Sequence, residues 1–337
     1  MTNVDEVYER LRGTGPERDG WLSNHAPMAA EALIRHGHER IVHRWLDDYA
    51  DRLETRPRGI SPVLADDWES PLGDPTRTGD WLNFFDRELA LAPWREVLVS
   101  WWPRLLPGIA AGATHGVIRV GHAVRSLIDG PTPARIGELG QGLAYWAARW
   151  QPLAPPGAGP YPATDPRSAL DAVPRVPDQR SGARERLAQL AATPGWAGAS
   201  GAVPGDPADD VPTRLAAIVE AATLRHGTHG YAAPVMLVHA ATAPSAVARV
   251  LPVLPDALWK PSLAAAWSAT AAITAAYSPG TARPVPARPP ELVMALAAED
   301  GDEHAIKFAD TALDVYARTG SARVLDSARH SIHLLGA

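Results

Sequence analysis

The segment Asp302-Glu303-His304-Ala305-Ile306-Lys307-Phe308-Ala309-Asp310, near the C-terminus, has the pattern of a buried helix. Apolar residues recur at three- and four-residue spacing from Ile306 to Tyr316, which predicts a helix with a broad buried face. The acidic residues around Asp302 favour a helix start, because anions are stabilised at the N-terminal end of the helix dipole. His304 and Lys307 are three residues apart, so they share a face with Cβ atoms about 5–6 Å apart.

Lys307 is unusual in this chain. Only two of the 32 Lys and Arg residues are lysines, so arginine is used wherever a positive charge alone is required. Arginine cannot lose its proton or form a carbamate, whereas lysine can do both. We therefore interpret Lys307, which stands between Ile306 and Phe308, as a residue with a chemical role.

Length and composition set the protein class. The 337 residues, 46% of them hydrophobic, can form one large domain or two ordinary ones with a sizeable core. The sequence has no run of eighteen uncharged apolar residues and no signal-peptide pattern, so we predict a cytoplasmic protein that does not bind membranes. The absence of cysteine excludes disulfides, thiolate metal sites and a cysteine nucleophile. The net charge of −6, without a basic cluster, argues against nucleic-acid binding.

The same helical periodicity recurs along the chain, with no persistent strand alternation and no internal repeat. Loops rich in proline and glycine are expected at 54–76, 151–182 and 279–290. We predict an all-α protein with a single large, bundle-like helical domain over 1–337, and the loop 151–182 is the alternative position for a sub-boundary. Helices are expected near 4–12, 29–34, 38–53, 81–92, 94–106, 109–128, 133–150, 183–193, 208–224, 233–244, 261–276, 291–298, 302–319 and 321–335.

Four of the twelve histidines, His25, His115, His239 and His304, lie among small and apolar residues. His25 stands at the start of a helix that Ser23 or Asn24 can cap. Imidazoles from several helices that converge in a bundle hold redox metals in many proteins. However, the sequence has no HExxH motif, no repeated Glu-x-x-His pair and no cysteine spacing. Taken singly, each histidine is better explained as a packed core or helix-end residue.

His122 follows His115 by seven residues, which on a straight helix is about 10.5 Å along the axis. The two cannot bind one metal ion unless Gly116 or Gly121 breaks the helix. We therefore expect His122 to support a ligand, to face a substrate or to be packed. Arg119 and Arg125 share its face and could bind a phenolate or carboxylate, although surface ion pairing explains them equally well.

Other catalytic templates are absent from the sequence. There is no GxSxG elbow, no Walker A motif and no GxGxxG motif after a strand. Gly140-Gln141-Gly142 lies within a helical pattern and is therefore not a nucleotide-binding loop. A Rossmann-type flavin or nicotinamide site would need a parallel sheet, which the periodicity does not support.

Four segments, each with one of the four histidines, follow one another along the chain. They are Ser23-Asn24-His25-Ala26-Pro27-Met28, Thr114-His115-Gly116-Val117-Ile118-Arg119-Val120-Gly121-His122-Ala123, Leu237-Val238-His239-Ala240-Ala241-Thr242 with Pro244, and Asp302-Glu303-His304-Ala305-Ile306-Lys307. Together with the helix from Glu138 to Ala147, they resemble the questin oxidase-like family. The resemblance covers nearly the whole chain in the family's order, and it is more specific for membership than for substrate.

Members of this family open the ring of anthraquinones such as questin, in a Baeyer–Villiger-like or dioxygenase-like oxidation. The resemblance implies a mononuclear non-haem Fe(II) ion with four histidine ligands and one carboxylated lysine. Carried over by position, His25, His115, His239 and His304 would be the imidazole ligands and Lys307 the carbamate. A carbamate would turn a buried cation into an anionic oxygen ligand.

This chain differs from the fungal members in two respects. It is shorter, and Arg119 stands where they carry a second histidine in this helix. His122 is therefore the alternative to His25 as the fourth histidine ligand.

We therefore expect an O2-dependent oxygenase that acts on a polycyclic aromatic or quinone-like small molecule in specialised metabolism. Lys307, His122 and Arg119 are the candidate catalytic residues, and Fe(II) is the expected cofactor, with NADPH as a less supported reductant. The partners expected are a small aromatic substrate and O2. Two alternatives are a metal-free helical protein that binds a hydrophobic small molecule, and a Baeyer–Villiger enzyme that uses NADPH or no cofactor. A flat apolar pocket or ordinary core packing would explain the aromatic residues Trp21, Trp101, Trp102, Tyr145 and Trp146.

Overall fold

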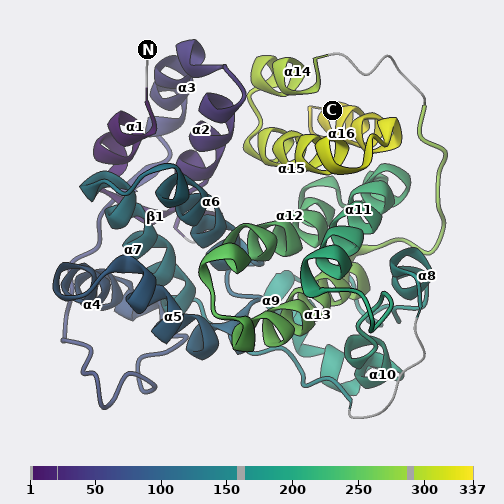
Figure 1. Cartoon of the computed structure of the whole chain (residues 1–337), viewed down its shortest axis with the longest axis horizontal. Helices are drawn as coiled ribbons and strands as arrows, with labels where there is room; N and C mark the ends of the chain where they lie inside the picture. Colours follow the sequence, from purple (N-terminus) through teal and green to yellow (C-terminus); the bar gives the residue numbers. More distant parts are fainter. Residues whose placement is uncertain (1–2, 21, 158–163, 287–291, 337) are drawn as a thin grey trace. The chain divides into compact units, whose positions relative to one another are not determined.

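The computed structural model describes residues 3–20, 22–157, 164–286 and 292–336. Within these residues the chain forms sixteen α-helices and three short strands (Figure 1). The predicted all-α class is therefore confirmed. The chain divides into two compact units, Met1–Pro152 with Pro252–Pro255 and Leu153–Leu251 with Asp256–Ala337. The first passage between units falls between Pro152 and Leu153, at the start of the loop expected at 151–182.

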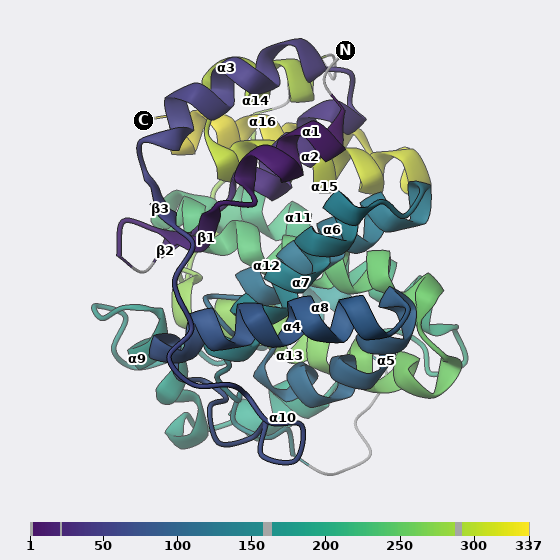
Figure 2. The ribbon, with the colours of Figure 1, turned by 90° about the vertical axis from the view of Figure 1, so that its left-hand side faces the viewer.

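The first unit, called unit 1 below, is built around α6 and α7. These two helices pack against each other, and α7 also packs against α4 and α1, while α2 packs against α3 and α6 (Figure 2). Thr132 caps α7 by accepting a hydrogen bond from the N–H of Arg135. The helices of unit 1 are α1 (Val4–Leu11), α2 (Ala26–Arg35), α3 (Glu39–Ala50), α4 (Thr78–Leu91), α5 (Trp94–Leu105), α6 (His115–Asp129) and α7 (Pro133–Ala148).

Unit 1 also contains a small antiparallel sheet, of which two strands precede α2 and the third follows α3. Its strands, β1 (Thr14–Arg18), β2 (Leu22–Ser23) and β3 (Leu53–Thr55), lie in the order β2-β1-β3. The sequence pattern predicted no strands here, because segments of two to five residues are too short to show alternation. The sheet contacts the start of α2 through Asn24, whose side chain donates to the carbonyl of Gly15 at 3.1 Å. It thereby positions the residue before His25.

The second unit, called unit 2 below, is centred on α12, which packs against α11, α13 and α15. α15 also packs against α16 and α14. The short helix α8 lies within the segment expected to be a loop, and Asp165 caps it. The helices of unit 2 are α8 (Pro166–Asp171), α9 (Ala183–Ala188), α10 (Trp196–Gly201), α11 (Val211–His229), α12 (Pro234–Val250), α13 (Trp259–Tyr277), α14 (Val293–Asp300), α15 (Glu303–Thr319) and α16 (Ala322–Leu335).

The segment Pro234–Val253, which contains α12, is long and apolar enough to cross a membrane by length and composition. Its most apolar window is 72% buried in the structure, which is typical of a core helix. Such a helix is weak support for membrane insertion. The expectation that the protein does not bind membranes stays a prediction.

Gly116 allows the close approach of α6 and α7. A Cβ atom at this position would lie 2.8 Å from both Cβ and Cγ of Trp146. The Trp146 ring is fully buried, and its indole N–H donates to the carbonyl of Gly108 at 2.9 Å, so it cannot move aside cheaply. A side chain at Gly116 would therefore separate the two helices.

We predict that Gly116→Ala lowers the free energy of unfolding by about 1–3 kcal/mol, because overpacking at Trp146 outweighs the gain in helix propensity. The matched control is Gly137→Ala on α7, where a Cβ atom would meet nothing within 4 Å. This control should raise stability by up to about 1 kcal/mol. Urea denaturation followed by circular dichroism measures both, and equal effects of the two substitutions would contradict the packing argument.

Candidate metal centre

His25 and His115 form a buried pair in unit 1. His25 immediately precedes α2, and His115 is the first residue of α6. Their ring centroids lie 4.5 Å apart in an edge-on arrangement. Nδ1 of His25 lies 2.5 Å from the carbonyl oxygen of Ser23, and Nδ1 of His115 lies 2.5 Å from that of Gly112. A proton on Nδ1 donated to a carbonyl places the lone pair on Nε2, which is the tautomer that binds metals.

The turn before His115 is conformationally strained. Gly112, Ala113 and Thr114 have φ values of 53°, 55° and 73°, so three consecutive residues adopt the left-handed region. Ala113 and Thr114 carry side chains, and such a conformation costs about 1–2 kcal/mol per residue. This strain sets the direction in which α6 begins and so the position of His115. The helix predicted over 109–128 therefore begins only at His115, and this start could not be predicted because only Gly112 signals a left-handed residue.

His239 and His304 form a second buried pair, in unit 2. His239 lies on α12 and His304 on the first turn of α15, with ring centroids 5.6 Å apart. Asp302 caps α15, as expected from the acidic residues there, and accepts the backbone N–H of His304 at 2.8 Å. Burial, together with the nearby charge of Lys307, lowers the pKa of His304. Its imidazole is therefore neutral at pH 7, as metal binding requires.

Lys307 lies one turn beyond His304 on α15, and its side chain is fully buried. The structure thus places it as the sequence predicted, on the same helix face as His304. Burying an ammonium group is unfavourable, because the charge loses its hydration. A buried lysine amine is consequently a good candidate for conversion to another species.

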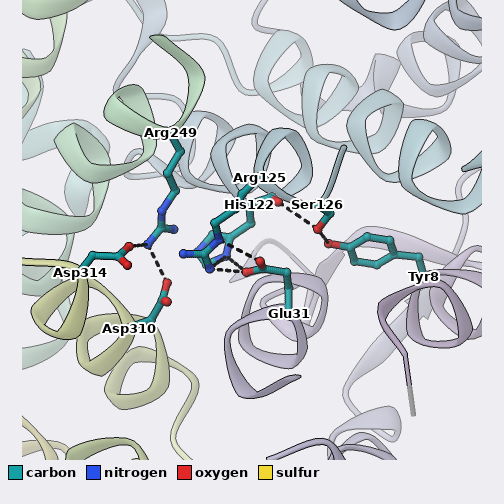
Figure 3. A network of polar contacts seen from close by, with 8 residues as sticks. All are labelled: Tyr8, Glu31, His122, Arg125, Ser126, Arg249, Asp310 and Asp314. Atoms are coloured by element: carbon teal, nitrogen blue, oxygen red, sulfur yellow. Dashed lines mark hydrogen bonds and ion pairs between the residues drawn. The ribbon is translucent and has the colours of Figure 1, made fainter. Parts of the chain in front are cut away.

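A buried ion pair joins the two helices that carry this pair. Arg249 on α12 donates to Asp310 on α15 at 2.6 Å and to Asp314 at 3.2 Å (Figure 3). Asp310 is fully buried and follows Lys307 by three residues. Asp310 was not among the residues predicted from the sequence to have a role. The feature of the sequence that points to a role for Asp310 is its position on the buried face of a helix, because a buried carboxylate requires a cationic partner.

A corresponding ion pair joins α2 to α6 in unit 1. Glu31 on α2 accepts from both Nε and Nη2 of Arg125, and lies 2.7 Å from Nδ1 of His122 (Figure 3). Although burial raises the pKa of Glu31, the Arg125 charge and the His122 contact lower it to about 2. Tyr8 extends the network by donating to Ser126, which bonds to the carbonyl of His122. Glu31 is therefore ionised at neutral pH and bridges the helices that carry His25 and His115.

The structure decides several of the sequence alternatives. α6 is continuous from His115 through Asp129, so the helix break that would let His122 bind the same ion as His115 does not occur. Arg119 is buried rather than on the surface, and donates two hydrogen bonds to Glu138, at 2.6 and 2.9 Å. Arg125 is likewise buried, in the pair with Glu31. These side chains already have carboxylate partners within unit 1.

Four of the five aromatic residues for which the sequence left a pocket or core packing open contribute to the core of unit 1. Trp101 packs edge-on against Trp81, Phe84 and Phe85. Two further residues, Trp102 and Trp146, pack edge-on against each other. Tyr145 is also fully buried, while Trp21 lies outside the described residues. Core packing therefore explains the four that the structure describes.

The donor set suits a metal ion. The side chains of His25 and His115 in unit 1 and of His304 in unit 2 are buried, and each offers a ring nitrogen that could serve as a metal ligand. Neutral imidazoles bind zinc, iron, copper and nickel, so these residues do not select one metal.

No family model and no curated protein matches the chain. The questin oxidase-like resemblance therefore depends on the segments around the four histidines and on the Glu138–Ala147 helix. The activity and the substrate class remain proposals.

We predict that Glu31→Gln lowers the free energy of unfolding by about 3–5 kcal/mol at pH 7, because it leaves the buried Arg125 charge without its counterion. Glu31 has a lower pKa in the folded state than in the unfolded chain. Its contribution is therefore fully present above about pH 4.5 and is lost as the pH falls towards 2. The difference between wild type and variant should shrink over the same range.

The control for this measurement is Asp47→Asn, which breaks the exposed pair with Arg10. An exposed pair contributes less than about 1 kcal/mol. Denaturant unfolding at several pH values measures both variants. A Glu31→Gln effect as small as that of Asp47→Asn would contradict the assigned role of the buried pair.

Proposed function

We propose that the protein is a non-haem Fe(II)-dependent oxygenase that oxidises a polycyclic aromatic or quinone-type small molecule. The reaction class is a Baeyer–Villiger-like or C–C-cleaving ring opening in specialised metabolism, in a cytoplasmic protein. Two buried pairs of histidines are the observation that carries the proposal. In each of them, the histidines lie on or next to two helices that a buried carboxylate–guanidinium ion pair joins. A buried lysine lies beside one of the two. The proposed ligands are His25, His115, His239 and His304, with Lys307 as a carbamate.

Fe(II), when bound, would supply the electron-transfer chemistry with O2 that amino-acid side chains lack. The protein's contribution is to hold neutral imidazoles in fixed orientations. The carbonyls of Ser23 and Gly112 fix the rings of His25 and His115, and the cap at Asp302 fixes the start of the helix that carries His304. Ligands held in fixed orientations bind a metal ion more tightly than mobile ligands do.

Charge balance supports a carbamate at Lys307. Condensation of the neutral amine with CO2 forms an N–C bond and releases one proton, which gives an anionic oxygen donor. Four imidazoles are neutral, so they leave the charge of a divalent ion uncompensated, and one carbamate would offset part of it. The nearby Asp310 is already paired with Arg249 and does not supply this charge.

His122 and Arg119 enter the proposal as positioning residues. Each is bound to a buried carboxylate, Glu31 for His122 and Glu138 for Arg119. They connect α6 to α2 and to α7, and so hold His115 in place. An NADPH-dependent reaction has less support, because the strands in the described residues are antiparallel and a Rossmann-type site needs a parallel sheet.

We predict about one iron per chain after anaerobic reconstitution, measured by plasma mass spectrometry, and a loss of most of it in His304→Ala and Lys307→Ala. The matched control is Lys260→Ala, which removes the other lysine from an exposed position and should retain the metal. Circular dichroism checks that each variant is folded. Absence of stoichiometric metal in the wild type would refute the oxygenase proposal and favour a metal-free binding protein.

Two further variants separate the parts of this proposal. Lys307→Arg keeps a positive charge but cannot form a carbamate, so it should lose iron as Lys307→Ala does. Full iron content in this variant would exclude the carbamate. His115→Ala should also lose iron if both histidine pairs serve one ion, whereas full retention would assign the metal to unit 2 alone.

A further inference from the structure

Unit 2 contains a cavity of about 560 Å³, away from any residue assigned to the metal. Its walls come from α8, α11, α13 and α16 and from the segments that follow α8 and α13. A volume of this size is typical of sites for small molecules, which span about 300–1,000 Å³. The cavity is therefore large enough for a metabolite.

The lining of the cavity is strongly cationic. Four arginines from separate parts of the chain line it, and Asp171 is the only carboxylate among the lining residues. Asp171 is already paired with Arg225. Among the described residues, no carboxylate forms an ion pair with the other three arginines. The four arginines are Arg167, Arg175, Arg225 and Arg323.

One of these guanidinium groups, that of Arg225, is held in place by its surroundings. Arg225 has 14% of its side chain exposed, and it donates to Asp171 and, at 3.1 Å, to the hydroxyl of Ser278. The guanidinium of Arg175 lies against Gly280, where a Cβ atom would be 2.9 Å from Nη1. Gly280 therefore leaves room for the Arg175 side chain. Cationic groups with fixed positions lose little entropy when an anion binds.

Part of the cavity wall is apolar. Leu170, Val173, Ala221 and Leu224 line it alongside the arginines. A ligand that matches this lining has an anionic group for the guanidinium groups and an apolar portion for the remaining wall. Guanidinium groups bind phosphate oxygens with paired, charge-assisted hydrogen bonds.

We propose that this cavity is a binding site for a phosphorylated small molecule with an apolar portion. Three arginine charges remain after Asp171 offsets that of Arg225, which suits a dianionic phosphate ester better than a singly charged carboxylate. The inference does not depend on the proposed metal centre. It would stand even if the chain held no iron.

Isothermal titration calorimetry of the full-length protein with phenyl phosphate tests the proposal, with inorganic phosphate as the comparison. We expect phenyl phosphate to bind more tightly than inorganic phosphate, because its ring contacts the apolar wall. Arg175→Gln and Arg323→Gln should each weaken binding roughly tenfold or more, since each removes a charge-assisted hydrogen bond. Both residues are exposed at the cavity, so the substitutions should leave folding intact.

The matched control is Arg180→Gln, which removes one positive charge of unit 2 from an exposed side chain outside the cavity. It should change the affinity by less than about twofold at physiological salt, because screening weakens distant exposed charges. Equal losses in Arg180→Gln and Arg175→Gln would show non-specific attraction and overturn the proposal. No binding of phenyl phosphate at about 10 mM would overturn it as well.

Discussion

Each histidine pair in this protein lies on two helices that a buried carboxylate–guanidinium pair joins. Glu31 and Arg125 join α2 to α6, and Arg249 and Asp310 join α12 to α15. Such pairs contribute little net stability, since desolvation of the two charges offsets most of their attraction. Their effect is on geometry, because an unpaired charge would be left buried if either helix slid or rotated. The geometry of each histidine pair depends on this constraint.

The constraint matters because three of the four histidines are held by backbone features at helix ends. His25 and His115 stand where α2 and α6 begin, and His304 lies on the first turn of α15. A side chain at a helix end moves with any change in the direction of that helix. By fixing the directions of these helices, the buried ion pairs therefore also fix the positions of the imidazole rings. The strained turn before His115 acts in the same way, by setting where α6 starts.

The sequence predicts local features well and distant pairings poorly. The periodicity around Ile306 and the acidic cap at Asp302 predicted α15, and the helix start at His25 was also expected. Glu31 and Arg125 are 94 residues apart, and Arg249 and Asp310 are 61 apart, so no local pattern connects them. For the same reason the sequence left open whether Arg119 binds a ligand or forms a surface ion pair, since only the fold brings it to Glu138. The arginines of the unit 2 cavity were missed because they come from separate segments.

A physical reason explains why lysine stands at position 307 in a chain that otherwise uses arginine almost throughout. In the cavity and in the buried pairs, the side chain must stay charged and offer paired donors, which arginine does at any physiological pH. Lys307 is fully buried and next to His304, where a permanent charge would repel a metal ion. Lysine is the only cationic side chain that can lose its charge there and become an anionic ligand. Arginine thus stands at positions where the side chain stabilises the fold or is proposed to bind an anion. Lysine stands at position 307, where we propose a chemical change.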